Sequence, residues 1–204
     1  MIENTHKAER RLFSIGHSNH PLEKFLGLLK MHGIEILVDA RSYPYSKYAP
    51  HFASSSLSEA VAEVGAKYLF MGDELGGRPQ EDEFYDDEGH VLYSRLSQSP
   101  NFLEGIRRLE DEMKGYCTAI LCSEEDPSCC HRRLLVGRVL AERGIVLKHI
   151  RGDGRIQMDS EIVDKGLQDH DKGQASLFHE PEEPVWRSIQ SVSQKGKRMS
   201  SSEH

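Results

Sequence analysis

The chain has no long run of apolar residues. Across its 204 residues no such run approaches the length needed to cross a bilayer. Residues 1–11 are polar and lack the apolar centre of a secretory signal. We therefore expect a cytoplasmic protein without a membrane segment.

Positive charge is also in short supply. Lysine and arginine number 26 against 33 aspartate and glutamate residues, which gives a formal net charge of −7 and a pI near 5.9. This balance argues against a protein that coats nucleic acid through its overall charge. Localised contacts to DNA or to a phosphorylated ligand remain compatible with it.

Cysteine is scarce and confined to one short segment. The chain has four cysteines, Cys117, Cys122, Cys129 and Cys130. A disulfide scaffold would distribute its cysteines along the chain, and cytoplasmic thiols stay reduced. We expect these thiols to serve a reactive or metal-binding site.

Short apolar segments alternate with helical patterns. The predicted strands are 12–15, 34–38, 68–71, 117–122 and 145–150, and helical patterns lie between them. This alternation predicts an α/β fold, a three-layer sandwich around a mostly parallel sheet of about five strands. An acidic insert at 72–90 interrupts the alternation and is either a lid over the site or a solvated excursion.

The composition changes near residue 154. We expect an α/β domain at 1–154 and a flexible polar tail at 155–204, because the tail has too few apolar residues to fold alone. Its segment 174–178, Gln-Ala-Ser-Leu-Phe, resembles the peptide with which bacterial replication and repair proteins bind the sliding clamp. Gln174, Leu177 and Phe178 would be the anchors. A chance match, or a pocket on the chain's own domain, is the alternative.

Polar segments follow four of the predicted strands. They are 16–19, 39–41, 75–78 and 122–132. The carboxyl ends of parallel strands meet at one edge of a sheet, which is where α/β proteins place their ligands. The sequence therefore predicts a single site built from four distant segments.

The segment 122–132 supplies the reactive groups of this site. A helix start and a neighbouring cation would lower the pKa of the Cys130 thiol, and Cys122 is the alternative nucleophile. His131 and His17 are proton-transfer candidates, while Asp39 and Glu124 would orient them or carry protons. The candidate catalytic residues are Cys122, Cys130, His131, His17, Glu124 and Asp39.

Anion-binding groups lie in the same four segments. Arginine forks suit a phosphate or a carboxylate, and glycine lets the backbone approach a ligand closely. The candidate substrate-binding residues are Ser18, Asn19, Arg41, Gly76, Gly77, Arg78 and Arg132. Structural roles compete with these assignments: Asp39 and Arg41 would also form an internal ion pair, and Asn19 would also cap a helix.

Zinc is the competing interpretation of the thiol segment. Cys122, Cys130 and His131, with Cys129 or His17 as a further ligand, would supply nitrogen and sulfur donors. The spacing matches no paired Cys-x-x-Cys framework, and adjacent residues rarely ligate one ion together. We predict no cofactor and keep zinc as the alternative.

Several motifs resemble the bacterial and archaeal family catalogued as domain of unknown function 488 (DUF488). The similarity covers 13–150 and rests on the segments 14–19, 38–41 with Pro44 and Ser46, 75–78, 122–124 and 130–132. Ala40 stands where the family usually has valine. The resemblance implies an α/β domain of this kind and little about a reaction.

These observations predict a cysteine-dependent enzyme acting on a phosphate-bearing substrate, either a nucleotide or a nucleic-acid end. A clamp-binding tail would place it in DNA repair or replication. One alternative is a non-catalytic nucleotide- or DNA-binding module recruited through its tail. Another is a structural zinc protein.

Overall fold

A six-stranded sheet forms the centre of the protein. The computed structural model describes residues 11–45, 49–162 and 185–192. The strands are β1 (Leu12–Gly16), β2 (Ile36–Asp39), β3 (Lys67–Phe70), β4 (Thr118–Cys122), β5 (Lys148–Ile150) and β6 (Ile156–Met158), in the order β3-β2-β4-β1-β5-β6. All neighbours are parallel except β5 and β6. The predicted α/β class with a mostly parallel sheet is confirmed.

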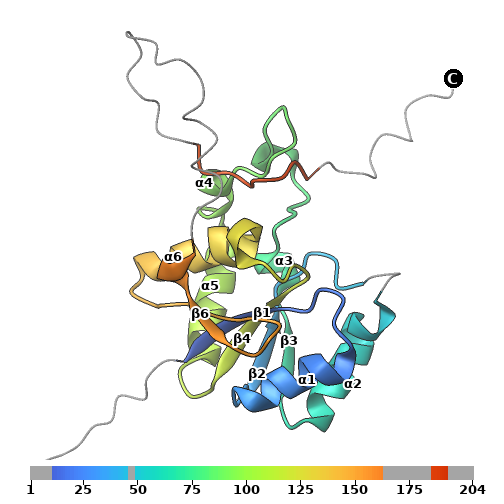
Figure 1. Cartoon of the computed structure of the whole chain (residues 1–204). Coiled ribbons are helices and arrows are strands. Elements are labelled where there is room, and N and C mark those ends of the chain that lie inside the picture. Colours follow the sequence, from blue (N-terminus) through green and yellow to red (C-terminus); the bar gives the residue numbers. More distant parts are fainter. Residues whose placement is uncertain (1–10, 46–48, 163–184, 193–204) are drawn as a thin grey trace, which may run out of the picture.

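Helices cover both faces of the sheet, so the molecule has three layers (Figure 1). Helices α1 (Leu22–Met31) and α2 (Ser54–Glu63) pack on one face, and α5 (Pro100–Glu112) and α6 (Arg138–Glu142) pack on the other. Successive side chains of β2 alternate between these layers: Ile36 and Val38 face α5, and Leu37 faces α1. Burial on both sides explains why the central strands read as continuous apolar runs.

The insert between β3 and α5 contains short helical segments. These are α3 (Gly72–Leu75), a 3₁₀ turn (Asp82–Phe84) and α4 (Tyr93–Leu96). Further 3₁₀ turns are Pro50–Phe52, Pro127–Cys129 and Asp159–Glu161, and a π-helical turn spans Arg132–Gly137. Among the helices of the described ranges, none is long and apolar enough to span a membrane.

Ordered structure extends past the domain boundary predicted at residue 154. Strand β6 adds to the edge of β5, and residues 185–192 lie along the insert that carries α4 (Figure 1). Trp186, the chain's one tryptophan, anchors this segment: its indole Nε1 donates to the carbonyl oxygen of Leu134 at 2.8 Å, and Arg138 stacks on its ring. The clamp-like peptide at 174–178 lies outside the described residues.

Helix α5 offers a matched test of the core. Phe102 is fully buried against the sheet, whereas its neighbour Leu103 is 39 % exposed. We expect Phe102→Ala to lower the free energy of unfolding by about 3–5 kcal/mol, because it leaves a cavity. Leu103→Ala should change it by less than about 1 kcal/mol. Urea unfolding of both variants measures this, and equal losses would contradict the packing described.

Candidate active site

A cavity of about 340 Å³ opens at the carboxyl edge of the sheet. Strand β4 lies between β1 and β2, so Cys122 pairs with Gly16 in register and Leu121 pairs with Asp39. The cavity is lined by Arg41, Ser42, Tyr43, Tyr45, Gly77, Arg78, Tyr93, Cys122, Ser123, Glu124, Cys129, His131, Ser188, Gln190, Ser191 and Val192. Three of the four predicted segments thus contribute to one cavity.

Two thiols meet beneath this cavity. Cys122 ends β4, and Cys130 follows the 3₁₀ turn Pro127–Cys129. Their Sγ atoms lie within 4.8 Å of each other. Cys122 lines the cavity with 5 % of its surface exposed, while Cys130 is completely buried and does not line it. Of these two cysteines, a molecule in the cavity therefore meets Cys122 and not Cys130.

The His131 ring contacts both sulfurs. Its Nδ1 is 3.7 Å from the Cys122 Sγ and 3.9 Å from the Cys130 Sγ. Its Nε2 donates to the carbonyl oxygen of Ala40 at 3.0 Å, which fixes the orientation of the ring. Gly77 leaves room for it, because a Cβ there would lie 2.6 Å from the ring. The predicted role of Gly77 is thus at least partly one of packing.

The electrostatics separate the two thiols. The Cys130 S–H, which donates to the Cys122 sulfur, holds the pKa of Cys122 well below its ordinary value, with further help from His131 and Arg132. Burial, and then the Cys122 charge, raise the pKa of Cys130 well above its ordinary value. Burial opposes a charge on His131, but the Cys122 thiolate outweighs it and raises the pKa of the imidazole. The arrangement favours a Cys122 thiolate beside a His131 imidazolium.

The sequence argument gave Cys130 a lowered pKa and kept Cys122 as the alternative nucleophile, whereas the contacts in the structure lower the pKa of Cys122 and raise that of Cys130. Cys130 does precede a helical turn, Arg132–Gly137, as expected. Its thiol is nevertheless completely buried and lies next to the Cys122 thiolate, so ionising Cys130 would place two negative charges together. The helix position alone does not decide which thiol ionises.

Arg132 binds the protein rather than the cavity. Its guanidinium is 1 % exposed and donates to the Ser14 Oγ at 3.1 Å and to the carbonyl oxygens of Glu124 and Glu125 at 2.5 and 2.7 Å. It is not among the residues that line the cavity. This geometry gives Arg132 the task of holding the loop after β4, in place of the predicted contact with substrate.

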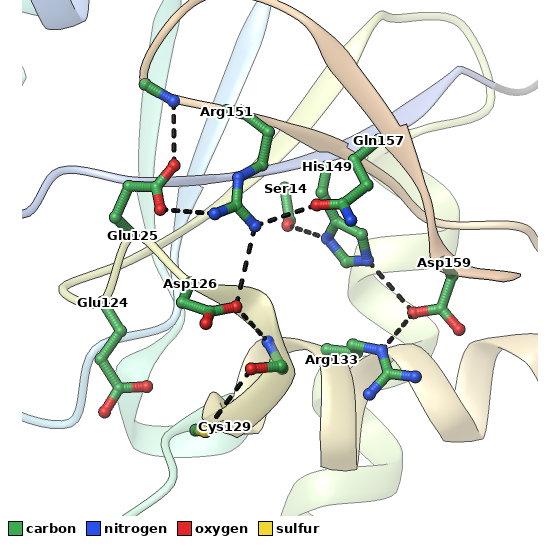
Figure 2. Close-up of polar contacts among 12 residues, drawn as sticks. Ser14, Glu124, Glu125, Asp126, Cys129, Arg133, His149, Arg151, Gln157 and Asp159 are labelled. Atoms are coloured by element: carbon green, nitrogen blue, oxygen red, sulfur yellow. Dashed lines mark hydrogen bonds and ion pairs between the residues drawn. The ribbon is translucent and has the colours of Figure 1, made fainter. Parts of the chain in front are cut away.

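A second set of contacts ties the same loop to the β5–β6 turn (Figure 2). Arg151 donates to the Glu125 carboxylate at 2.7 Å and lies 3.7 Å from that of Asp126. The amide of Gly152 also donates to Glu125, at 3.0 Å. The Glu124 side chain points away from these contacts in Figure 2 and lines the cavity. Partial desolvation and the Cys122 charge raise the pKa of Glu124.

Figure 2 also shows hydrogen bonds that link Ser14, His149 and Asp159. The Ser14 hydroxyl accepts from Arg132 and so donates to the His149 Nδ1 at 2.7 Å, and the His149 Nε2 donates to Asp159 at 3.1 Å. The order resembles a catalytic triad, but Ser14 and His149 are both 0 % exposed. No substrate reaches this serine, so these hydrogen bonds serve to position Arg132.

Asp39 and Arg41 form the internal ion pair that competed with a substrate role. The Arg41 Nε and Nη2 donate to the Asp39 carboxylate at 2.8 and 2.6 Å, and Nη2 also donates to the carbonyl oxygen of Phe52. Asp39 accepts a further bond from the Tyr68 hydroxyl at 2.6 Å and is fully buried. Arg41 lines the cavity, but most of its N–H donors are already bonded to the protein and not available to a ligand. Asp39 does not line the cavity.

His17 supports Arg41 from behind. Its Nδ1 donates to the carbonyl oxygen of Ser18 at 2.8 Å, so its Nε2 accepts from the Arg41 Nη1 at 3.1 Å. Burial, reinforced by the Arg41 charge, lowers the pKa of His17 to about 4. His17 does not line the cavity. A neutral ring with both nitrogens engaged is poorly placed for the predicted proton transfer.

The remaining predicted ligands divide between packing and open space. Ser18 and Asn19 do not line the cavity, and Gly76 is packed so closely that a Cβ would lie 2.2 Å from the Gly72 carbonyl oxygen. Arg78 is exposed and lines both this cavity and a neighbouring one of about 530 Å³. Of the three predicted arginines, Arg78 is the one whose side chain faces open volume.

Several residues of the cavity wall escaped the sequence argument. Tyr93 comes from the insert, and residues 188 and 190–192 come from the segment predicted as a flexible tail. Backbone hydrogen bonds join that segment to the insert, from Ser188 to Val91 and from Val192 to Gly89, each at 2.8 Å. The lone tryptophan in a polar stretch was the available signal for this contact.

The zinc alternative has three ligand atoms in place. Those of Cys122, Cys130 and His131 lie within 4.8 Å of one another, and in the described part of the chain no fourth histidine, cysteine or carboxylate joins them. Structural zinc sites use four protein ligands. Of the further ligands considered, His17 is engaged by Arg41, and Cys129 lies outside this group.

Comparison with known proteins identifies the family. The model of the domain of unknown function DUF488 matches residues 21–139, so the chain belongs to that family, as its motifs predicted. No curated protein and no solved structure matches the chain. The family is thus established, whereas a reaction is not.

The asymmetry of the thiols predicts selective alkylation. We expect iodoacetamide to modify Cys122 rapidly at neutral pH, with a rate that falls only well below the ordinary thiol pKa of about 8.5. His131→Asn should move the pH at which this reaction slows upward by about one unit, because the imidazolium no longer stabilises the thiolate. Peptide mapping by mass spectrometry measures each site.

Two controls accompany this measurement. Burial raises the pKa of Cys117, so that thiol should stay unmodified in the same sample. Metal analysis of the sample should find no stoichiometric zinc, which excludes protection of the thiols by a bound ion. A Cys122 rate that follows an ordinary thiol titration in metal-free protein would contradict the thiolate assignment.

Proposed function

We propose that the chain is a cysteine-dependent enzyme in which the Cys122 thiolate is the nucleophile. One observation carries this proposal: Cys122 lines the cavity at the end of β4, with the His131 Nδ1 3.7 Å from its sulfur and the buried Cys130 next to it. A thiolate with an imidazole partner in a partly closed cavity is the usual arrangement of cysteine nucleophiles. Of the two candidate nucleophiles from the sequence, the proposal thus selects Cys122.

His131 and Glu124 are the proton carriers in this proposal. The His131 imidazolium contacts the nucleophilic sulfur and is positioned to protonate a leaving group as the thiolate attacks. Glu124 lines the same cavity, and its raised pKa brings it closer to the range in which a carboxyl group exchanges protons. Asp39 and His17 hold Arg41 and do not touch the substrate.

A phosphate-bearing substrate suits the cavity wall. Arg78 is exposed and offers its guanidinium, and Arg41 also lines the cavity. Tyr43 and Tyr45, which are 63 % and 68 % exposed, line the cavity too. Exposed aromatic rings stack on bases, so we favour a nucleotide or a nucleic-acid end over a simple phosphorylated metabolite.

Two alternatives remain. The cavity would equally hold a nucleotide without turnover, in which case the chain is a binding module and Cys122 is dispensable for ligand affinity. The three ligand atoms described above favour a zinc protein if metal analysis finds a stoichiometric ion. Each alternative gives a different result in the experiment that follows.

A panel of nucleotides and 5′- or 3′-phosphorylated oligonucleotides tests the function. We expect Cys122→Ser to lower turnover by at least about a thousandfold, because an alcohol is a far weaker nucleophile than a thiolate. Arg78→Ala should weaken binding about tenfold or more, the effect of losing a charge-assisted hydrogen bond. Product analysis reports turnover, and the fluorescence of Trp186, beside the cavity segment 188–192, reports binding.

Arg107→Ala is the matched control for Arg78, because Arg107 is an exposed arginine on α5 and does not line the cavity. Binding without turnover, unchanged in Cys122→Ser, would favour the binding module. Equal effects of Arg78→Ala and Arg107→Ala would contradict the anion-binding role of Arg78.

We also propose a cytoplasmic setting in DNA repair or replication, in which the tail binds the sliding clamp. This rests on the peptide at 174–178 alone. The double variant Leu177→Ala/Phe178→Ala should lose recovery on immobilised clamp while the full-length chain is retained. Equal recovery of both would remove the link to replication.

A further inference from the structure

The two thiols of the site are arranged to join each other. We propose that Cys122 and Cys130 form a reversible disulfide when a hydroperoxide oxidises Cys122. The inference uses the same sulfur as the proposed function but needs no substrate. It rests on the closeness of the sulfurs and on their unequal access to the cavity.

Access assigns different tasks to the two sulfurs. Cys122 lines a cavity of about 340 Å³, ample for hydrogen peroxide or a small organic hydroperoxide. Cys130 is 0 % exposed and does not line that cavity. The oxidant therefore meets Cys122 first, and Cys130 reacts only with what forms on Cys122.

The first step oxidises Cys122. Its thiolate attacks the terminal oxygen of the hydroperoxide ROOH, the O–O bond breaks, and the leaving alkoxide takes the proton of the His131 imidazolium. The products are the Cys122 sulfenic acid, a neutral His131 and the alcohol ROH, which is water for hydrogen peroxide. The sulfur has been oxidised by two electrons and the peroxide reduced by two.

The second step consumes the sulfenic acid. The Cys130 thiol gives its proton to the His131 Nδ1, 3.9 Å away, and attacks the Cys122 sulfur. Hydroxide leaves and takes that proton as water, so a disulfide and one water molecule result. One ring contacts both sulfurs and serves both steps.

The two sulfurs already lie close together. The Sγ atoms lie within 4.8 Å of each other and must approach to about 2.05 Å, a change within reach of side-chain rotation. Arg132 and Arg151 hold the loop that separates the two cysteines. They keep Cys130 beside Cys122 and prevent it from swinging away.

The other cysteines are poorly placed to compete. Cys117 precedes β4, at the opposite edge of the sheet from the cavity, and its sulfur donates to the His32 carbonyl oxygen. Cys129 also lines the cavity, but its sulfur lies 3.5 Å from the Ser128 hydroxyl and is not within the group of ligand atoms around His131. The bond should therefore form specifically between Cys122 and Cys130.

Oxidation of the Cys117→Ala/Cys129→Ser variant by hydrogen peroxide tests this inference, because Cys122 and Cys130 are then the only thiols. We expect the intact mass to fall by two hydrogen atoms and both free thiols to disappear, with recovery after dithiothreitol. Cleavage at Glu124 and Glu125 and at arginine should yield two fragments joined by the disulfide.

Single variants in the same background provide the controls. Cys130→Ser should stop at the sulfenic acid and be trapped by dimedone, whereas Cys122→Ser should keep its remaining thiol. Sulfinic acid on Cys122 without a crosslink, or identical products with and without Cys130, would overturn the inference. Such a result, with rapid alkylation of Cys122 intact, would leave the proposed enzyme standing. A disulfide without turnover of any substrate would support the inference and contradict the proposed enzyme.

Discussion

The site depends on one buried cation. Placing the Arg132 guanidinium at 1 % exposure is costly unless its donors and its charge are compensated. Ser14 and the carbonyl oxygens of Glu124 and Glu125 accept its hydrogen bonds, and the Cys122 thiolate offsets its charge. The hydrogen bonds of Arg132 thus fix the conformation of the loop after β4. Arg132 in turn stabilises the thiolate, and it does so without any molecule bound in the cavity.

This arrangement explains why the two cysteines differ. Both lie within reach of the same histidine and the same arginine, so proximity to cations does not distinguish them. The hydrogen bond between them does: the Cys130 S–H donates to Cys122 and lowers its pKa, while burial and the Cys122 charge raise the pKa of Cys130. Only one thiol of this pair carries a negative charge, and it is Cys122, which lines the cavity.

The fold was accessible from the sequence, and the site was accessible only in part. Buried parallel strands leave continuous apolar runs, so β1, β2 and β4 and the meeting of their polar ends could be predicted. Strand β6 could not, because an edge strand needs only a neighbour's backbone groups and leaves no apolar run. Local patterns likewise could not reveal that Arg132 points inward or that the His17 Nε2 accepts a hydrogen bond from Arg41. Those outcomes depend on contacts between residues far apart in the chain.

Reactivity and protection are linked in this site by a single contact. The Cys130 S–H that stabilises the Cys122 thiolate also places a second sulfur beside it. A cysteine with a lower pKa is present as thiolate, the form that oxidants attack, to a larger fraction at neutral pH. A neighbouring thiol converts the resulting sulfenic acid before further, irreversible oxidation. Replacing Cys130 therefore changes both properties together. Cys130 thus has a physical reason to be a cysteine even though no ligand in the cavity reaches it.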